Sequence, residues 1–337
     1  MKIEENYSLL PHNTFGIDVK TRWFIEYESE EELKKILSDE YFISLPFLHI
    51  GEGSNLLFLS DFDGVILHSH IMGIEVLQKN ASFVDIKAGA SVAWDDLVAW
   101  CVEQNWGGIE NLSFIPGETG AAAVQNIGAY GVEIKDCLLE VHAYNIETGD
   151  KEIFSNAGCK FAYRESIFKT THSGKYILTH VVLRLSAQPV FNLEYGNLKE
   201  VLSSQPEINL QAVRNAIIRI RKNKLPDPEK TSNAGSFFKN PYIDREHYED
   251  LKRTYPDMPH YPVDEKAVKI PAAWLIDQCG WKGKQMGHAA VHTRQPLVLI
   301  NTGGATGEEI AALAEAIRQD VKKIFLIDLE PEVLYIN

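Results

Sequence analysis

The chain has 337 residues, of which 45% are hydrophobic and 24% are charged. This is ordinary for a globular protein, and the length predicts about two domains. The formal net charge of −14 argues against binding to nucleic acid or to an anionic membrane. No apolar run of about 18 residues, signal-peptide core or CxxC pair is found, so we expect a cytoplasmic protein with reduced cysteines.

The first part of the chain, to about residue 186, predicts short strands separated by glycine-rich turns. The expected strands are 47–50, 55–58, 65–67, 83–87 and 176–185. One helix is predicted over 93–104. Its apolar side consists of Leu97, Val98, Cys101 and Val102.

The second part begins near residue 206, and we place a domain boundary between 190 and 210. Asn209 is a plausible N-cap for a helix that must end at Lys224-Leu-Pro-Asp-Pro228, because proline does not continue a helix. Thr306-Gly-Glu-Glu309 is a capping box that starts a second helix. Strands are expected over 297–300 and 333–336, which makes this part α+β.

Positive charge gathers between Arg214 and Lys239, where seven Lys or Arg residues stand against two acids. This basic island has two interpretations. It is either a solvated helix face or a docking surface for a small anionic ligand.

Two glycine-rich regions are candidate phosphate-binding elements. Gly51-Glu-Gly-Ser-Asn55 separates two expected strands, so it is either a tight hairpin or a turn that presents backbone N–H groups to a phosphate. The second region comprises Ile115-Pro-Gly-Glu-Thr-Gly120 and Val124-Gln-Asn-Ile-Gly-Ala-Tyr-Gly131, where small residues permit close backbone approach. Two such regions favour a dinucleotide held by backbone, and the alternative is that the second region forms only structural turns.

Several polar residues have a structural and a functional interpretation. Arg164, beside Tyr163, suits a carboxylate or enolate, or else a structural salt bridge. Glu332 is either an exposed strand-end acid or, if buried, a proton donor with a raised pKa. His288 and His292 have helical i, i+4 spacing but lack further ligands, so we expect no metal site.

Asn233-Ala-Gly-Ser-Phe-Phe-Lys-Asn-Pro241 is the most informative segment. It places a hydroxyl, a cation and an amide beside flexible backbone and two aromatic rings. The combination is typical of a polar group held in the apolar wall of a pocket.

These motifs, in this order, resemble the UDP-N-acetylenolpyruvoylglucosamine reductase family, and the loop at Tyr195 is similar to that of its type I branch. The resemblance covers nearly the whole chain. It implies an α+β fold, with a vanillyl-alcohol-oxidase-type FAD-binding domain of two subdomains and a C-terminal substrate domain. The implied boundaries are 1–70, 71–205 with a tyrosine loop near 191–198, and 206–337.

The resemblance also implies the chemistry. Non-covalent FAD would take a hydride from NADPH as co-substrate and pass it to UDP-N-acetylglucosamine enolpyruvate, giving UDP-N-acetylmuramate for peptidoglycan synthesis in the cytoplasm. A monomer is expected. Two other functions remain open: an FAD oxidase with another substrate, and a non-catalytic nucleotide-sugar binding protein.

Residue roles follow from the resemblance, position by position. Ser236 would donate a proton to C2, and Arg164 and Glu332 would stabilise the enolate-like intermediate. Ten positions match FAD-binding residues: Gly51, Gly53, Ser54, Asn55, Pro116, Gly117, Gly120, Gln125, Asn126 and Gly128. Six match substrate-binding residues: Tyr130, Tyr163, Tyr195, Lys224, Asn240 and Gln295. Phe237 and Phe238 are expected to be packing residues.

Overall fold

The computed structural model describes residues 1–203 and 205–337, which divide into two compact units. Unit 1 consists of Met1–Tyr7, Thr21–Glu52 and Asp63–Arg221. Unit 2 consists of Ser8–Lys20, Gly53–Phe62 and Lys222–Asn337. The chain therefore passes between the units several times, which differs from the continuous domains expected above.

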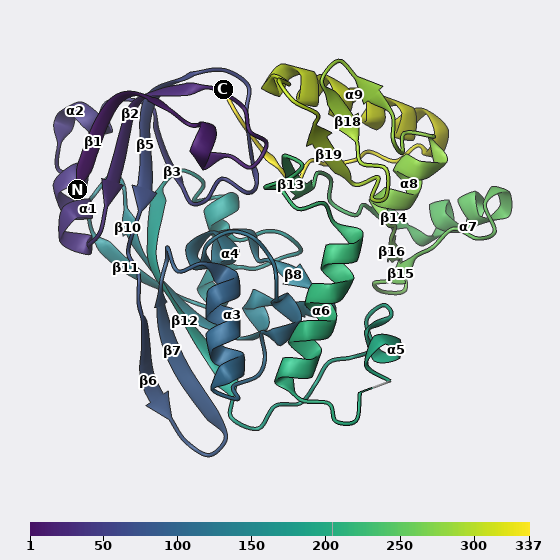
Figure 1. The fold of residues 1–337 in the computed structure, drawn as a ribbon, viewed down its shortest axis with the longest axis horizontal. Coiled ribbons are helices and arrows are strands. Elements are labelled where there is room, and N and C mark those ends of the chain that lie inside the picture. The colour runs from purple at the N-terminus through teal and green to yellow at the C-terminus, as the bar shows by residue number, and fades with distance from the viewer. Residues whose placement is uncertain (204) are drawn as a thin grey trace. The chain divides into compact units, whose positions relative to one another are not determined.

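Two sheets form the framework of unit 1 (Figure 1). The antiparallel five-stranded sheet has the order β11 (Lys151–Ser155), β10 (Leu138–Asn145), β12 (Tyr176–Ser186), β7 (Phe83–Gly89) and β6 (Ile74–Lys79). The four-stranded sheet has the order β1 (Lys2–Ser8), β2 (Lys20–Tyr27), β5 (Phe62–Ser69) and β3 (Phe47–Ile50), with β3 parallel to β5. Smaller elements are α2 (Glu40–Ile43), α5 (Leu198–Leu202), β8 (Gly128–Ala129) and β9 (Val132–Glu133).

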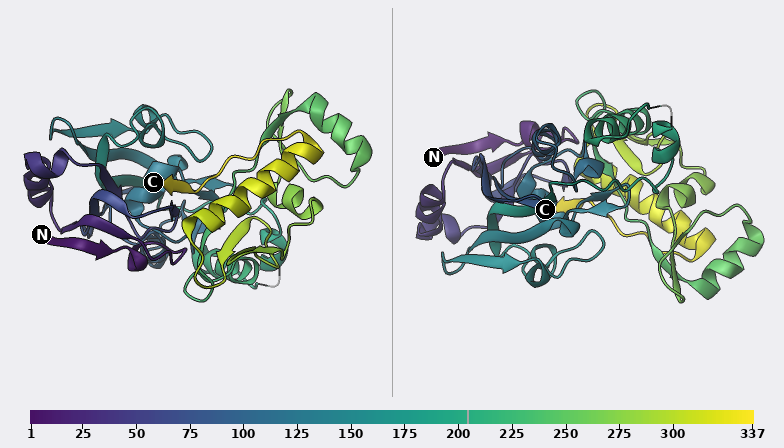
Figure 2. Two further views of the ribbon diagram at one scale, coloured as in Figure 1. Left: turned by 90° about the horizontal axis from the view of Figure 1, so that it is seen from above. Right: turned by 90° about the horizontal axis from the view of Figure 1, so that it is seen from below.

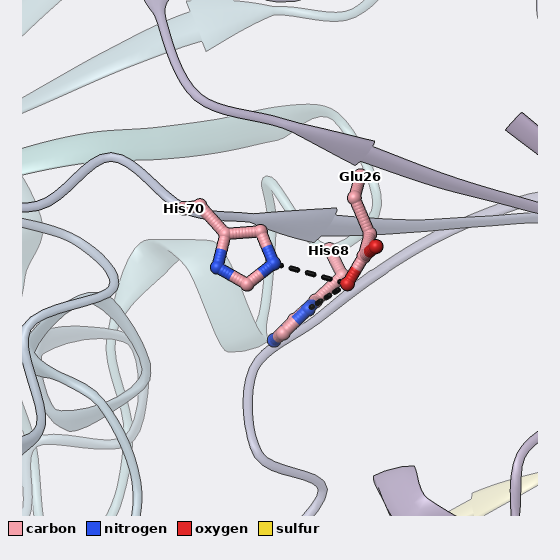
Figure 3. A group of neighbouring side chains, drawn as sticks. All are labelled: Glu26, His68 and His70. Carbon is pink, nitrogen blue, oxygen red and sulfur yellow. Dashed lines mark hydrogen bonds and ion pairs between the residues drawn. The ribbon is translucent and has the colours of Figure 1, made fainter. Parts of the chain in front are cut away.

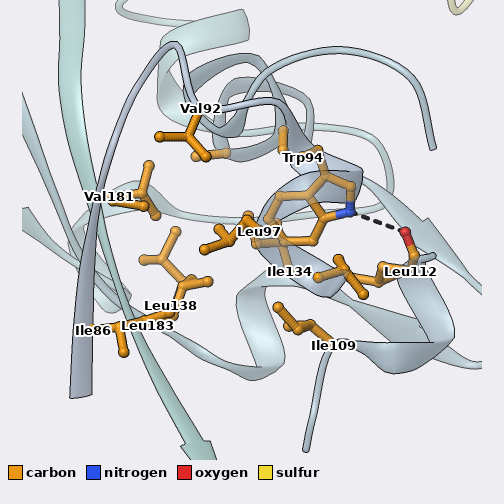
Figure 4. Packing of buried hydrophobic residues seen from close by; sticks show 14 of the residues in the cluster. Ile86, Val92, Trp94, Leu97, Ile109, Leu112, Ile134, Leu138, Val181 and Leu183 are labelled. Carbon is orange, nitrogen blue, oxygen red and sulfur yellow. Dashed lines mark hydrogen bonds between the residues drawn. The ribbon is translucent and has the colours of Figure 1, made fainter. Parts of the chain in front are cut away.

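Helices cover these sheets with apolar faces. The predicted helix over 93–104 is confirmed as α3 (Trp94–Glu103), whose buried residues join the core of the five-stranded sheet. Within that core, the Trp94 indole N–H donates to the Leu112 carbonyl at 2.9 Å, so its only polar atom is satisfied (Figure 4). Helix α1 (Glu30–Leu37) begins at the Ser29 cap and packs Leu33 and Ile36 into the second core.

Helix α6 (Leu210–Lys224) is bound to unit 1 by its arginines. Its predicted start is confirmed, because the Asn209 side chain accepts from the Ala212 amide at 2.9 Å. The Arg214 guanidinium donates two hydrogen bonds to the Asp95 carboxylate, of 2.5 and 2.9 Å. Seven residues later, Arg221 donates to the Phe114 carbonyl at 3.0 Å. These contacts explain why the chain up to Arg221 clusters with unit 1.

The Asp95–Arg214 pair predicts a stability that depends on pH. Burial opposes the ionised form of Asp95, but hydrogen bonds from Arg214 and the Phe114 amide outweigh it and hold the pKa of Asp95 below its usual value. A lowered folded-state pKa stabilises the fold above the ordinary aspartate pKa of about 4, and this contribution is lost as the pH falls through the folded-state pKa. We expect Asp95→Asn to lower the free energy of unfolding at pH 7 by about 1–2 kcal/mol, as measured by urea unfolding.

The control for this substitution is Asp96→Asn. Asp96 is exposed in the same helical turn, so its substitution should change stability by less than about 0.5 kcal/mol. The gap between Asp95→Asn and the wild type should shrink below about pH 4. A gap that is constant with pH would contradict the ion-pair explanation.

Unit 2 contains a four-stranded sheet in the order β13 (Asn233–Ser236), β19 (Val298–Asn301), β18 (Ala289–Val291) and β17 (Gln285–Met286). The long helix α9 (Gly307–Phe325) packs on β18 and β19 (Figures 1 and 2). Its predicted capping box is confirmed, with Thr306 and Glu309 exchanging hydrogen bonds. The other elements are α7 (Arg245–Thr254), α8 (Ala272–Gln278), β14 (Tyr242–Asp244), β15 (Tyr261–Pro262) and β16 (Ala267–Lys269).

Strand β4 (Leu56–Phe58) pairs in parallel with β20 (Leu334–Ile336), near the C-terminus. Strand β3, which precedes the turn at 51–55, pairs with β5 instead. The hairpin interpretation of this turn is therefore wrong, since its two flanking strands belong to different sheets. No helix in the described parts of the chain combines the length and apolar character needed to cross a bilayer.

Candidate active site

Ser236 lies at the end of β13, where the strand is irregular. The pairing of β13 with β19 shifts register between Asn233 and Ser236, and Gly235 between them has a φ of 69°. Glycine adopts this conformation at little cost, and a bulge re-aims the side chain that follows it. The Asn233 side chain accepts from the Gly235 amide at 2.8 Å and fixes the turn. Within the motif, the conformation of Gly235 thus orients the hydroxyl of Ser236.

Glu332 is brought beside this strand by backbone hydrogen bonds. Its amide donates to the Phe237 carbonyl at 2.8 Å, and the Lys239 amide donates to the Glu330 carbonyl at 2.9 Å. Phe237 and Phe238 are 0% and 1% exposed, which confirms their predicted packing role. The Phe237 ring packs edge-on against Phe15 and Tyr335. The half-buried Ser236 and Glu332 are thus attached to one rigid aromatic block.

Three other predicted residues of unit 2 have clear structural partners. The Lys239 ammonium lies 3.4 Å from the Glu330 carboxylate. The Asn240 carbonyl oxygen accepts from the Ala272 amide at 2.9 Å and so caps the start of α8, which leaves its NH₂ group for a ligand. Gln295 is buried in the turn before Leu297, whose carbonyl holds the Phe237 amide at 2.8 Å. Asn240 therefore follows the Ser236 strand in sequence, and Gln295 precedes its partner strand β19.

The glycine loop of unit 1 presents an amide to an anion. Its backbone is fixed by hydrogen bonds from Thr119 to Val92 and from Gly120 to Ala90, of 2.9 and 2.8 Å. The Gly117 amide, at a φ of 105°, donates to the Glu52 carboxylate at 3.0 Å. Burial raises the pKa of Glu52. An amide that holds a carboxylate oxygen is also suited to a phosphate oxygen.

Glycine is required at several of the predicted flavin positions. A Cβ on Gly51 would come within 2.8 Å of the Glu118 carboxylate, and one on Gly120 would come within 2.9 Å of the Ala90 Cβ. In unit 2, a Cβ on Gly53 would meet the His12 carbonyl oxygen at 1.9 Å.

Two polar residues follow Gly53 in the same turn. Ser54 is half-buried, and the Asn55 side-chain NH₂ group donates to the Glu332 backbone carbonyl at 3.0 Å. Asn55 therefore links a predicted cofactor turn to a predicted catalytic residue.

Asn126 braces the turn that follows α4 (Thr119–Gln125). It is fully buried at a φ of 45°, and its NH₂ group donates to Glu133 and to the Ala162 carbonyl at 2.9 and 2.8 Å. Its carbonyl oxygen accepts from the Lys135 amide at 3.3 Å. The side chain is thus used within the protein, and a contact with flavin remains a prediction for its backbone. Gln125 is half-buried just before it, and Pro116 is exposed at the start of the glycine loop.

Arg164 occupies a tight turn closed by reciprocal 3.0 Å hydrogen bonds between Ala162 and Glu165. Its φ is 58°, an uncommon value for a residue with a side chain. The guanidinium donates to the Gly128 carbonyl at 2.5 Å and lies 5.2 Å from the centre of the Tyr163 ring. A strained residue whose side chain is held from two sides is typical of a functional position.

Arg221 is a residue that the sequence interpretation did not select. Burial lowers the pKa of its guanidinium, and the positive charge of Arg164 contributes in the same direction, which places the two cations near each other. Tyr130 shares this environment, and burial raises its pKa. Its ring meets the partly exposed Tyr195 edge-on at 6.2 Å. The i, i+7 spacing of Arg214 and Arg221 was the available signal, because it puts both on one helix face.

Lys224 and two histidines are the remaining positions that the sequence interpretation discussed. Lys224 is exposed at the last residue of α6. His288 and His292 flank a strand rather than sharing a helix face. His288 is exposed and pairs with Glu309 at 3.3 Å, whereas His292 is buried, which lowers its pKa. This geometry gives no paired ligand atoms at 288–292.

Comparisons with known proteins cover both units. Residues 22–152 match the FAD binding domain family, and residues 227–336 match the C-terminal domain of UDP-N-acetylenolpyruvoylglucosamine reductase. UDP-N-acetylenolpyruvoylglucosamine reductase of Bacteroides fragilis is 50% identical over 99% of this chain and its own full length. That of Porphyromonas gingivalis is 47% identical over the full length of both chains.

Solved structures show the same fold. The crystal structure of UDP-N-acetylenolpyruvylglucosamine reductase from Thermus caldophilus aligns over the full length of both chains, with a TM-score of 0.69 and 22% identity. A solvent-stable cholesterol oxidase aligns over 98% of this chain and 86% of its own, with a TM-score of 0.52 and 12% identity. The expected α+β architecture, a vanillyl-alcohol-oxidase-type FAD-binding domain with a C-terminal substrate domain, is confirmed.

Proposed function

Since this chain belongs to the UDP-N-acetylenolpyruvoylglucosamine reductase family, we propose that the residues described above carry out the reaction that gives the family its name. The protein is an FAD-dependent oxidoreductase of peptidoglycan precursor synthesis, a UDP-N-acetylmuramate dehydrogenase. Its substrates are UDP-N-acetylglucosamine enolpyruvate and NADPH. The observation that carries the residue-level proposal is the attachment of Ser236 and Glu332 to one buried aromatic block.

The described residues fit a bound FAD. Gly51, Gly117 and Gly120 leave no room for side chains or hold positive φ, and the Gly117 amide already holds an anionic oxygen. When bound, FAD would supply the hydride chemistry between NADPH and C3 of the enolpyruvyl group. We propose that the Gly117 amide then holds a phosphate oxygen in place of the Glu52 carboxylate. The Asn126 brace positions the adjoining turn.

Three side chains complete the reaction after the hydride arrives. Negative charge develops on C2 and on the substrate carboxylate, where the fixed positive charge of Arg164 stabilises it. Ser236 donates its hydroxyl proton to C2. Glu332, attached to the same aromatic block, would act as the protonated acid and donate a hydrogen bond to the developing charge. The bulge at Gly235 matters because proton donation requires the hydroxyl to be within hydrogen-bond reach of one carbon.

Several polar and aromatic groups would anchor the substrate. Lys224 and Tyr195 are exposed and would bind the diphosphate of the nucleotide, while the free NH₂ group of Asn240 and the buried Gln295 would bind the sugar. Tyr130 and Tyr163 would also contact the substrate. The exposed basic residues at the end of α6 support the interpretation of the island as a docking surface.

Flavin spectroscopy tests the proposed function. Purified protein should be yellow and should oxidise NADPH rapidly only when the enolpyruvyl sugar nucleotide is present. Protein that binds flavin but is not reoxidised by this substrate would instead be an oxidase or dehydrogenase of the same fold. Protein that binds the sugar nucleotide without turnover would be a binding protein.

Monomeric assembly and a cytoplasmic location complete the proposal. Both substrates named above are charged nucleotides, and a diphosphate does not cross a lipid bilayer unaided. An enzyme that consumes them must therefore act in the compartment where they are made. Size-exclusion chromatography with light scattering checks the expected mass of about 38 kDa.

A further inference from the structure

Two histidines and a glutamate converge on the four-stranded sheet of unit 1, outside the residues assigned above (Figure 3). His68 lies in β5, and His70 follows two positions later, so both project to the same side of the strand. Glu26 lies in the neighbouring strand β2. The His70 amide donates to the Tyr27 carbonyl at 2.7 Å and fixes the two strands side by side.

The donor atoms of this group are close together. His70 Nε2 lies 3.0 Å and His68 Nδ1 lies 3.7 Å from the same Glu26 oxygen, Oε1. One donor atom from each of the three residues lies within 4.8 Å of the others. Ligands at 2.0–2.1 Å from a tetrahedral zinc ion are about 3.3 Å apart. The His70 side chain is 43% exposed and has the freedom to close the remaining difference.

We propose that Glu26, His68 and His70 form a binding site for a divalent transition-metal ion, with Zn²⁺ as the best fit. Two imidazoles and one carboxylate are a donor set suited to zinc, and three protein ligands leave a fourth position for water. The sequence interpretation expected no metal site, because it found no CxxC pair and no further ligand for the histidines at 288–292. A His-x-His pair at the end of a strand was the relevant pattern.

The surroundings of His68 support this assignment. Its second ring nitrogen, Nε2, lies 3.5 Å from the carboxylate of Glu118, which is only 7% exposed. Histidines that bind metals nearly always bond a carboxylate or carbonyl through the other nitrogen, which orients the ring. Glu118 directly follows Gly117 of the glycine loop. The site is therefore linked through one imidazole to the loop proposed to hold FAD.

One cation competes for Glu26. The Lys2 ammonium lies 3.8 Å from Glu26 and 2.6 Å from Glu4. Its side chain is 61% exposed, and exposed ion pairs contribute little, so a metal ion displaces it from Glu26 at small cost. Glu4 retains Lys2 as its partner. The negative charges of Glu26 and Glu118, which both lie near His68, still favour a cation at this site.

Zinc binding to the flavin-containing enzyme tests the proposal. Equilibrium dialysis against ZnCl₂ should find one zinc ion bound per wild-type chain. Two variants, His70→Ala and Glu26→Gln, should each bind zinc more weakly. Each should weaken binding by at least about 10-fold, the lower end of what loss of a supporting partner alone causes. The matched control is His288→Ala, which removes an exposed histidine that pairs with a single glutamate and should leave binding unchanged.

Thermal unfolding supplies a second readout. ZnCl₂ should raise the melting temperature of the wild type and of His288→Ala, but not of His70→Ala, because only an ion bound to the folded state stabilises it. Both site variants should retain a full complement of FAD, which shows that they fold. An absence of bound zinc, or zinc bound equally well by His70→Ala and Glu26→Gln, would overturn the proposal. The cluster would then be an ordinary hydrogen-bonded ion pair.

Discussion

Ser236→Ala should separate the two half-reactions of this enzyme. Reduction of the flavin by NADPH should proceed at nearly the wild-type rate, since the hydroxyl is needed only when C2 is protonated. Reoxidation by the enolpyruvyl substrate should slow by about 10²–10⁴-fold, the usual contribution of a positioned general acid. Anaerobic stopped-flow spectroscopy measures both rates from the flavin absorbance.

Ser232→Ala is the matched control for this experiment. Ser232 lies four residues earlier in the same segment, and its backbone carbonyl, not its hydroxyl, holds Asn301 at 3.0 Å. Its removal should leave both rates within about two-fold of the wild type, as expected of a residue outside the chemistry. Equal slowing of the two half-reactions in Ser236→Ala would mean that the serine supports the fold of the site and does not donate the proton.

The strongest local signals in the sequence predicted their elements well. The Asn209 cap and the Thr306 capping box fix helix starts through hydrogen bonds only three residues long, so the sequence alone carries them. The turn at 51–55 was ambiguous for the opposite reason. Its strands pair with β5 and β20, and the second partner lies almost 280 residues further along the chain. No local pattern reports such a pairing.

In the candidate site, too, local features could be predicted from the sequence, whereas contacts between distant segments could not. Ser236 and the flexible backbone beside it could be selected from the sequence, because Gly-Ser between apolar residues has few structural uses; the bulge itself required the structure. The environment of Arg221 was not, since it depends on how α6 lies against Phe114 and Tyr130. The His68–His70 pair was also missed, because a metal pattern was sought at helical spacing, whereas strands repeat every two residues. That Asn126 is buried could likewise be seen only once the fold was known.

Arg164→Gln is the second substitution with a large expected effect. It removes the fixed positive charge beside the developing enolate, and loss of one such electrostatic group costs about 10²–10³-fold in rate. The loss should appear in flavin reoxidation by the sugar nucleotide and not in reduction by NADPH. Arg164→Lys should recover part of it, because it restores the charge without the planar fork. Rapid-scanning stopped-flow spectroscopy compares the three proteins.

The amount of bound FAD in the Arg164 variants distinguishes a structural role of this residue from an electrostatic one. The guanidinium also holds the Gly128 carbonyl, so a loosened turn would lower FAD occupancy and slow both half-reactions in the Gln and Lys variants alike. Lys160→Gln is the matched control, since Lys160 is an exposed cation at a similar φ of 46°. It should behave as the wild type.

The double variant Ser236→Ala, Arg164→Gln decides whether the two residues act on one intermediate. Groups that stabilise and then protonate the same enolate are not independent, so the second substitution should cost far less than it does alone. Multiplicative losses would mean that the residues serve separate steps. Strong coupling would instead mean that both residues act on the same intermediate.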